Sequence, residues 1–154
     1  MVRNWRPRLR PRRVQPPPAD PIRPADPDER VEVSLTLAPR RPLSELEARL
    51  DQPMSREEFA ANYGADPAAI ATVETFAHAH GLEVLEASAP RRTVRLGGRG
   101  EDIGRVFGVT LMRQRLEDGT EFRAPDREVQ LPPDLSGIVE GVFGLDTRPV
   151  ARRR

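Results

Sequence analysis

The fold is decided by residues 63–84, which read YGADPAAIATVETFAHAHGLEV. Asp66 is a residue type that caps the free N–H groups at the start of a helix, and Pro67 suits the first helical position. Apolar side chains then recur at helical spacing at Ile70, Val73, Phe76 and Ala77. Gly81 can adopt the left-handed backbone that ends a helix. The stretch therefore predicts a capped amphipathic helix over 66–80 that leads straight into a strand.

Alternation, capping pairs and turn residues predict the other elements. We expect strands over 31–37, 82–88, 92–97 and 109–117, and helices over 44–51, 55–63 and 100–107. Asp118 and Gly119 form a tight-turn signal, so the residues on either side of them are expected to make a hairpin. The order strand, helix, strand, strand, helix, strand is the split βαβ arrangement. The predicted fold class is α+β: a ferredoxin-like split βαβ sandwich, an antiparallel sheet with its helices on one face, plus a C-terminal extension.

The composition divides the chain into three parts. Residues 1–30 contain eight Pro, eight Arg and four acidic residues with hardly any apolar periodicity, so we expect a disordered Pro/Arg-rich arm. Residues 31–147 contain 13 Arg against 20 Asp and Glu, a net charge of −7, and are long enough for one domain with its own core. Residues 148–154 are a basic tail or the start of a linker. The total net charge of +1 hides this separation of charge.

The residue types that catalysis or metal binding needs are missing or unsuitably spaced. The chain has no Cys and two His, and His78 and His80 are two positions apart, so they face apart on a helix. No Ser lies in a GxSxG motif. Glu101 and Asp102 follow Gly100 and would repel a phosphate at the start of that helix. We therefore expect no catalytic residue, no metal site and no cofactor.

Five segments follow one another in an order that a known family shares. They are VEVSLTL at 31–37, SREEFAANYG at 55–64, the helix and GLEV described above, RTVRLGGRGEDIGRVFGV at 92–109, and LPPDLSGIVEGVFGLD at 131–146. In these segments the chain resembles the pro-kumamolisin activation domain, the propeptide of the sedolisin (serine-carboxyl) peptidases. Each motif alone is weak, but five in sequence are much harder to obtain by chance. The resemblance covers about three quarters of the chain.

The resemblance implies a function that needs no catalytic residue in this chain. It implies a propeptide domain that acts as intramolecular chaperone and inhibitor of a sedolisin-type serine-carboxyl peptidase and is released by acid-triggered cleavage. The implied partner is the catalytic domain of that peptidase, in cis or in trans. An extracellular location is implied too, although the N-terminus has no apolar run typical of a signal peptide. No membrane partner is expected, because no stretch is apolar enough to span a bilayer.

The resemblance also implies that the sheet face without helices docks on the enzyme and that the C-terminal segment lies along the substrate groove. If Val94, Leu96, Val109 and Leu111 face the helices, alternation assigns the docking face to Glu83, Leu85, Thr93, Arg95, Thr110 and Met112. The groove-binding segment is then Val142, Phe143, Gly144, Leu145 and Asp146, and the expected cleavage region contains Arg148, Arg152, Arg153 and Arg154. A solvated sheet face and a solvated basic terminus remain open as alternatives.

Two other functions also remain open. A free-standing copy of the domain would act in trans as a diffusible peptidase inhibitor. The arm sequence RNWRPRLRPRR at 3–13 would attract phosphates and raises the hypothesis of a nucleic-acid-binding module. However, RTVRLGG and GVTLMRQR contain no aromatic residue on which a base could stack, and the body of the chain is acidic. Nucleic acid is therefore not the expected partner.

Overall fold

The computed structural model describes residues 18–48 and 51–149 of the chain. Its elements are β1 (Ala19–Pro24), β2 (Arg30–Leu37), α1 (Ser44–Glu47), α2 (Arg56–Tyr63), α3 (Pro67–Ala79), β3 (Glu83–Ser88), β4 (Thr93–Arg99), α4 (Gly100–Val106), β5 (Leu111–Leu116), β6 (Glu121–Pro125), the 3-10 helix η1 (Pro133–Leu135) and β7 (Val139–Phe143). Within these two ranges, no helix has both the length and the apolar character needed to cross a lipid bilayer.

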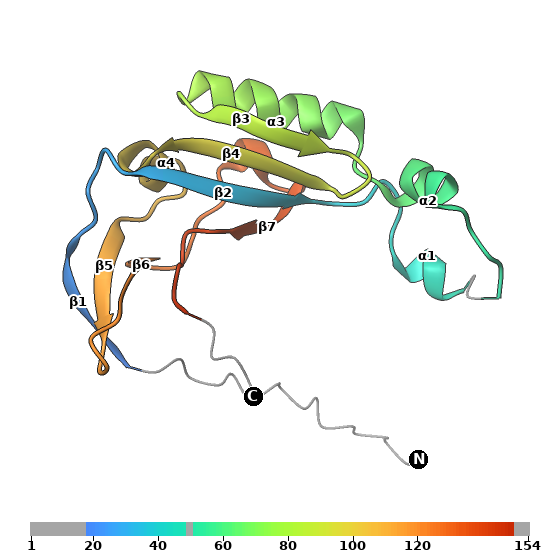
Figure 1. The fold of residues 1–154 in the computed structure, drawn as a ribbon. Helices are drawn as coiled ribbons and strands as arrows, with labels where there is room; N and C mark the ends of the chain where they lie inside the picture. The colour runs from blue at the N-terminus through green and yellow to red at the C-terminus, as the bar shows by residue number, and fades with distance from the viewer. Residues whose placement is uncertain (1–17, 49–50, 150–154) are drawn as a thin grey trace, which may run out of the picture.

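The strands form two antiparallel sheets, a main sheet of order β3-β4-β2-β7 and a small sheet of order β1-β5-β6. Figure 1 shows α3 lying across one face of the main sheet, with α1 and α2 beyond its end. α4 packs against the same face. A side chain at Gly98 of β4 would point into space that Leu82 and the α4 residue Ile103 already occupy. The sequence of β2, α3, β3, β4, α4 and β7 is the split βαβ order, so the predicted ferredoxin-like α+β fold is confirmed.

The fourth strand of the main sheet is β7, and the prediction that residues 109–117 would supply it is wrong. That segment forms β5, which pairs with β6 and β1 in the small sheet. Three consecutive polar residues, Arg113 to Arg115, leave β5 without an apolar row to place under the helices. β5 and β6 do form the expected hairpin, closed by a 2.9 Å hydrogen bond from Leu116 N to Thr120 O.

The predicted disordered arm is wrong for residues 19–24, because they form β1. Pro21 and Pro24 cannot donate backbone hydrogen bonds, but β1 is an edge strand that bonds to β5 alone, and prolines are tolerated at such edges. Ala25 N extends the pairing with a 2.8 Å hydrogen bond to Leu111 O. Residues 1–17, the rest of the predicted arm, lie outside the described residues.

The capping residues predicted α2 and α3 correctly. Asp66 caps α3 by accepting a 2.9 Å hydrogen bond from Ala68 N, and Gly81 follows the helix with a φ of 72°. Ser55 caps α2 in the same way, with Glu58 N as donor at 3.1 Å. α1 is shorter than predicted and begins without a side-chain cap, while residues 49–50 lie outside the described residues.

The core lies between the main sheet and the helices α3 and α4. Its buried residues include Val31, Val33, Leu35 and Leu37 of β2, Val94 and Leu96 of β4, Val73, Phe76 and Ala77 of α3, and Ile103 of α4. The C-terminal part of the chain contributes as well, because Val139 and Leu145 are only 7% and 3% exposed. The core is therefore complete only when residues near both ends of the described chain are in place.

Replacing Gly104 with alanine is expected to lower the free energy of unfolding by about 2 kcal/mol. A Cβ at this position of α4 would lie 2.6 Å from the carbonyl oxygen of Val109, a backbone atom that cannot move away without shifting the helix. Gly100 in the same helix is the matched control, because a Cβ there would meet its nearest atoms at 3.4 Å. Urea unfolding of both variants provides the measurement. Equal stabilities of the two variants would contradict the close contact.

Candidate functional site

The main sheet has one face that no helix covers within the described ranges, and we call it the open face. The buried side chains of β2 occupy every second position from Val31 to Leu37, so the side chains between them point away from the helices. Strand pairing places the following side chains together on the open face: Arg30, Glu32, Ser34 and Thr36 of β2, Thr93 and Arg95 of β4, Glu83, Leu85 and Glu86 of β3, and Phe143 of β7.

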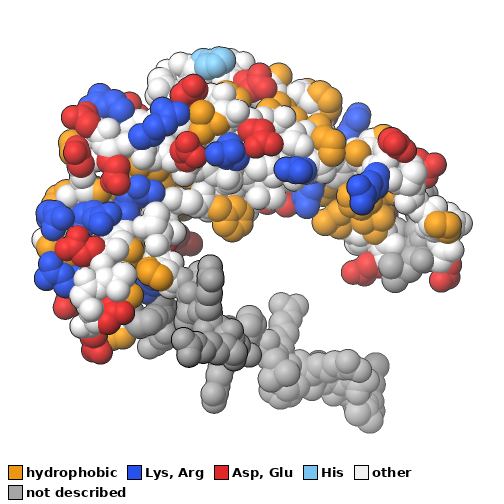
Figure 2. Space-filling model, in the orientation of Figure 1, with side chains coloured by type: hydrophobic (Ala, Val, Ile, Leu, Met, Phe, Trp, Pro, Cys, Tyr) orange, Lys and Arg blue, Asp and Glu red, His pale blue; other side chains and the backbone are white. Residues whose placement is uncertain are grey.

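The open face lines a hollow in the molecular surface. In Figure 1 it looks away from α3, with the small sheet on one side and the helices α1 and α2 on the other. Figure 2 shows in the same orientation that the described surface is concave here and that acidic, basic and hydrophobic side chains are mixed around it. A surface of this shape can receive a convex part of another molecule.

Arg95 lies at the centre of the open face and binds two carboxylates. Its guanidinium group is 3.0 Å from Glu32 Oε2 and 3.3 Å from Glu86 Oε2, and these two hydrogen bonds raise the pKa of Arg95. Arg30 forms a similar 2.8 Å ion pair with Glu83. All of these side chains are about half exposed, so the pairs add little to the stability of the fold. Their effect is to fix the positions of the charges on the face.

Apolar side chains stand at both edges of the open face. Phe143 is 60% exposed, more than any other large apolar side chain in the described residues. Its ring lies over Gly141, where an added Cβ would come within 2.9 Å of the ring. Leu85 occupies an irregular position of β3 and lies over Gly97 in the same manner, at 3.1 Å. The two glycines thus leave room for apolar side chains to spread across the sheet.

The docking residues predicted from the sequence divide into two groups. Glu83, Leu85, Thr93 and Arg95 lie on the open face as expected. Thr110 and Met112 do not, because they belong to the segment of β5, in the small sheet: Thr110 N donates a 2.8 Å hydrogen bond to Asp126, and Met112 stands between Pro24 and Ala124. Glu32, Ser34 and Thr36 also lie on this face and were not predicted to, although the alternation of VEVSLTL puts them opposite the buried residues of that strand.

The predicted groove-binding segment is part of the folded domain in this structure. Val142 and Phe143 lie in β7 and pair with Leu35 and Ser34. Gly144 has a φ of 103° and packs against the backbone of Glu32, Leu145 is buried, and Asp146 accepts a hydrogen bond from Arg148 N. A segment that supplies a strand and core residues cannot lie along a partner's groove without leaving the fold. The expected C-terminal extension is therefore corrected for Val142 and Phe143, which lie in a strand of the main sheet.

The chain after β7 ties the two sheets together. Thr147 N donates to Arg123 O of β6 at 2.8 Å, and Arg123 N donates to Thr147 Oγ1 at the same distance. The guanidinium group of Arg148 lies 4.7 Å from the centre of the Phe122 ring. Of the expected cleavage region, Arg148 is thus packed on the small sheet, while Arg152, Arg153 and Arg154 lie outside the described residues.

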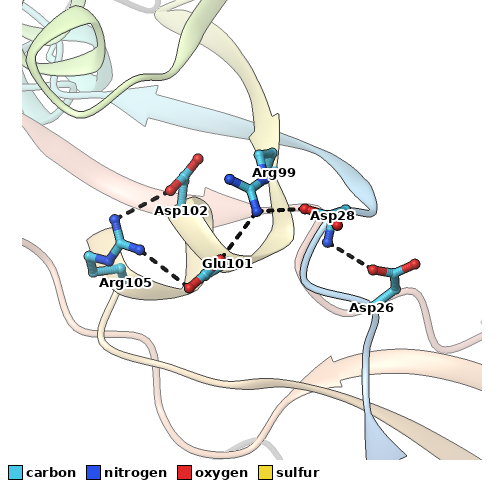
Figure 3. A network of polar contacts seen from close by, with 6 residues as sticks. All are labelled: Asp26, Asp28, Arg99, Glu101, Asp102 and Arg105. Carbon is cyan, nitrogen blue, oxygen red and sulfur yellow. Dashed lines mark hydrogen bonds and ion pairs between the residues drawn. The ribbon is translucent and has the colours of Figure 1, made fainter.

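A polar network closes one end of the open face, where β4 runs into α4 (Figure 3). It comprises Asp26, Asp28, Arg99, Glu101, Asp102 and Arg105. Arg99 binds both Asp28 and Glu101, and Arg105 lies 3.6 Å from Glu101 and 3.3 Å from Asp102. The acidic start of α4 is therefore held in ion pairs that attach the helix to the β1–β2 connection.

Neither histidine takes part in a polar cluster. His80 caps the end of α3 and contacts Phe76 with ring centres 4.2 Å apart, and His78 lies two residues earlier with its side chain exposed. Within residues 18–48 and 51–149, no three His, Asp or Glu side chains are grouped in a way that could hold a metal ion. The central strands β2 and β4, both wholly described, present no aromatic side chain on the open face. A base-stacking surface of the kind found in single-strand nucleic-acid readers is thus missing from them.

Comparison with known proteins identifies the family to which the chain belongs. The family model described as the activation domain of pro-kumamolisin matches residues 19–148 of the chain. Kumamolisin from Bacillus sp. (strain MN-32) is 35% identical to the chain over 150 residues, which cover 91% of this chain and 27% of kumamolisin. The chain thus spans about a quarter of the length of this relative.

Proposed function

The chain belongs to the pro-kumamolisin activation domain family, the propeptides of sedolisin-type peptidases, and from this premise we propose that it serves such a peptidase as intramolecular chaperone and inhibitor. Domains of this family are not themselves catalytic. The observation that carries the proposal is the open face, which is concave, free of helices in the described ranges and edged by the exposed Phe143. The peptidase that it serves is a serine-type endopeptidase.

The composition of the open face supports docking of a folded protein. Protein interfaces are enriched in aromatic residues and Arg relative to the rest of the protein surface. Here Phe143 and Leu85 supply apolar contact, and Arg95 supplies a charge whose position Glu32 and Glu86 fix in advance. Because the side chains are already held, little conformational entropy is lost when a partner binds.

Such a face explains how one domain can both guide the folding of a peptidase and inhibit it. A ligand that binds only the native state of a protein stabilises that state by mass action. A rigid sheet that binds the folded peptidase therefore favours its native structure during folding. The same complex blocks the enzyme for as long as the propeptide stays bound.

The substrate groove is reached by the chain after Arg148 in this proposal. Residues 142–146 are committed to the main sheet and its core, so they cannot occupy the groove while the domain is folded. Arg148, packed on Phe122, is the last side chain with a described contact to the small sheet. Cleavage after this point would separate the peptidase from a domain that remains folded.

Acid triggers release in this proposal, through carboxylates more than through His78 and His80. The open face alone carries Glu32, Glu83 and Glu86, each in an ion pair that fixes part of the charge pattern that a partner meets. In this proposal the domain acts on the peptidase either in cis, within one precursor, or in trans.

Inhibition in trans tests the proposed function. The purified chain is expected to hydrolyse no peptide and to inhibit a sedolisin-type peptidase that lacks its own propeptide. Removal of residues 149–154 is expected to weaken inhibition, because the groove contact is lost, whereas removal of residues 1–17 is expected to have no effect. Initial rates with a fluorogenic peptide give the inhibition constants. Absence of inhibition by a chain shown to be folded by circular dichroism would refute the proposal.

A further inference from the structure

One face of the small sheet carries three arginines in lateral register. Arg23 of β1 stands opposite Arg113 of β5, and Arg113 stands opposite Arg123 of β6. The next row along the strands contains Asp20, Arg115 and Glu121. Figure 2 shows basic side chains crowded over this end of the molecule. Like charges placed directly opposite one another destabilise a sheet, so the arginine row needs compensation.

A single carboxylate provides most of that compensation. The Glu121 carboxylate lies 3.1 Å from the guanidinium group of Arg115, 3.6 Å from that of Arg23 and 3.7 Å from that of Arg113. The pair with Arg23 reaches from β6 across β5 to the edge strand β1.

The other charged groups around the row come from the β1–β2 connection. Glu29 lies 3.5 Å from Arg123, whose side chain is only 10% exposed and also donates a 3.3 Å hydrogen bond to Gly144 O. Asp26 lines a surface depression together with Glu29, Arg23 and Arg113. Glu29 and Asp26 are on the loop, so within the sheet itself Glu121 alone joins the strands by charge.

The main sheet has the opposite arrangement. There Arg95 is held by Glu32 and Glu86, and Arg99 by Asp28 and Glu101, so each of these two arginines has two carboxylate partners. In the small sheet one carboxylate pairs with Arg23, Arg113 and Arg115, and its protonation leaves Arg23 and Arg113 facing each other without this partner.

We propose that the arginine row makes the small sheet an acid-released element: protonation of Glu121 detaches the edge strand β1 from β5, while the main sheet keeps its structure. β1 is the weakest strand of the sheet because Pro21 and Pro24 donate no backbone hydrogen bonds and because its pairing with β5 is irregular between Pro21 and Arg23. Loss of the Arg23–Glu121 pair removes its one charged link to β6.

The direction of the pH effect follows from the electrostatics. The hydrogen bond from Arg115, together with the charges of Arg23 and Arg113, lowers the pKa of Glu121 from its ordinary value of 4.5. A carboxylate whose pKa is lower in the folded state stabilises the fold above its unfolded pKa, and the contribution is lost as the pH falls through the folded one. β1 therefore stays attached at neutral pH and is released below about pH 4.5.

Two further carboxyl groups make the same sheet sensitive to acid. Backbone hydrogen bonds from Thr120 and Thr110 lower the pKa values of Asp118 and Asp126 respectively. Asp118 lies in the β5–β6 turn and Asp126 directly follows β6. Acid thus weakens the hairpin at both of its ends.

Hydrogen exchange of the whole chain, followed by mass spectrometry from pH 3 to pH 7 and corrected for intrinsic exchange rates, tests the proposal. In the wild type, peptides from β1 are expected to lose protection below about pH 4.5 while peptides from β4 keep it. The Glu121→Gln variant is expected to exchange about tenfold faster in β1 at pH 7. Glu83→Gln is the matched control, because it removes one carboxylate from the main sheet, and it is expected to leave β1 unchanged.

A charge-relief variant keeps the test decisive if Glu121→Gln does not fold. Arg113→Gln removes one of the three opposed charges, so the loss of β1 protection in acid is expected to be smaller than in the wild type. A Glu121→Gln profile identical to the wild type, an unchanged profile of Arg113→Gln, or loss of β4 protection together with β1 would each overturn the proposal. None of these outcomes depends on the peptidase.

Discussion

The Phe143→Ala variant is expected to inhibit a sedolisin-type peptidase about 30-fold more weakly than the wild-type chain while folding normally. Phe143 is 60% exposed on the open face, so its ring contributes little to the core. Aromatic side chains that anchor interfaces typically lose about 2 kcal/mol or more of binding free energy on truncation, which corresponds to about 30-fold in affinity. Inhibition constants and urea unfolding curves of both proteins provide the two measurements.

Phe59→Ala is the matched control for this experiment. Phe59 is the other large exposed phenylalanine of the described residues, at 40%, but it lies on α2 beside Tyr63 and not on the open face. The control is expected to inhibit like the wild type. Equal inhibition by the Phe143 and Phe59 variants would remove the open face from the interface and leave only the chain after Arg148 as the inhibitory element.

Deletion of residues 139–154 is expected to abolish cooperative folding. The deletion removes β7, which pairs with β2, together with the buried side chains of Val139 and Leu145. Burial of these two side chains alone contributes about 3–6 kcal/mol, which is comparable with the whole stability of a small domain. It also uncovers Leu35 and Leu37 at the edge of the core. Thermal unfolding followed by circular dichroism is the measurement.

Deletion of residues 149–154 is the control, because it begins after the last described contact with the small sheet. The shorter deletion is expected to keep the wild-type unfolding midpoint. If the chain that ends at residue 138 unfolded with the same midpoint, the C-terminal segment would be an extension after all, and residues 142–146 would again be free to enter a groove.

The elements that the sequence predicted correctly are those fixed by local chemistry. α3 could be placed because Asp66, Pro67 and Gly81 act within one helical turn of its ends. The β5–β6 hairpin could be placed because Asp118 and Gly119 determine the turn themselves, with Gly119 at a φ of 88°. In each case the signal and the structure lie within a few residues of each other.

The elements that the sequence missed depend on distant partners. β1 looks unstructured by composition because of its prolines, and only the unpaired edge of β5 makes it a strand. β7 is short and contains Gly141, so its alternation is weak, and only the edge of β2 identifies its place. The same limit split the predicted docking face: alternation tells which residues of a strand share a face, but it does not tell which strands share a sheet. For this reason Thr110 and Met112 were wrongly assigned to the docking face.

The pairing of β2 with β7 also determines when, during biosynthesis, the main sheet can be completed. The main sheet cannot be completed before Phe143 is available to pair with Ser34, because the two residues are partners across the strand pair. A chain that emerges from the ribosome therefore completes its open face only when β7 has left the exit tunnel, and contacts of such long range form late in folding. In a precursor, the polypeptide that follows leaves the tunnel after β7. Under the proposed function, the open face can thus be complete before a peptidase domain that follows in the same precursor has emerged to fold on it.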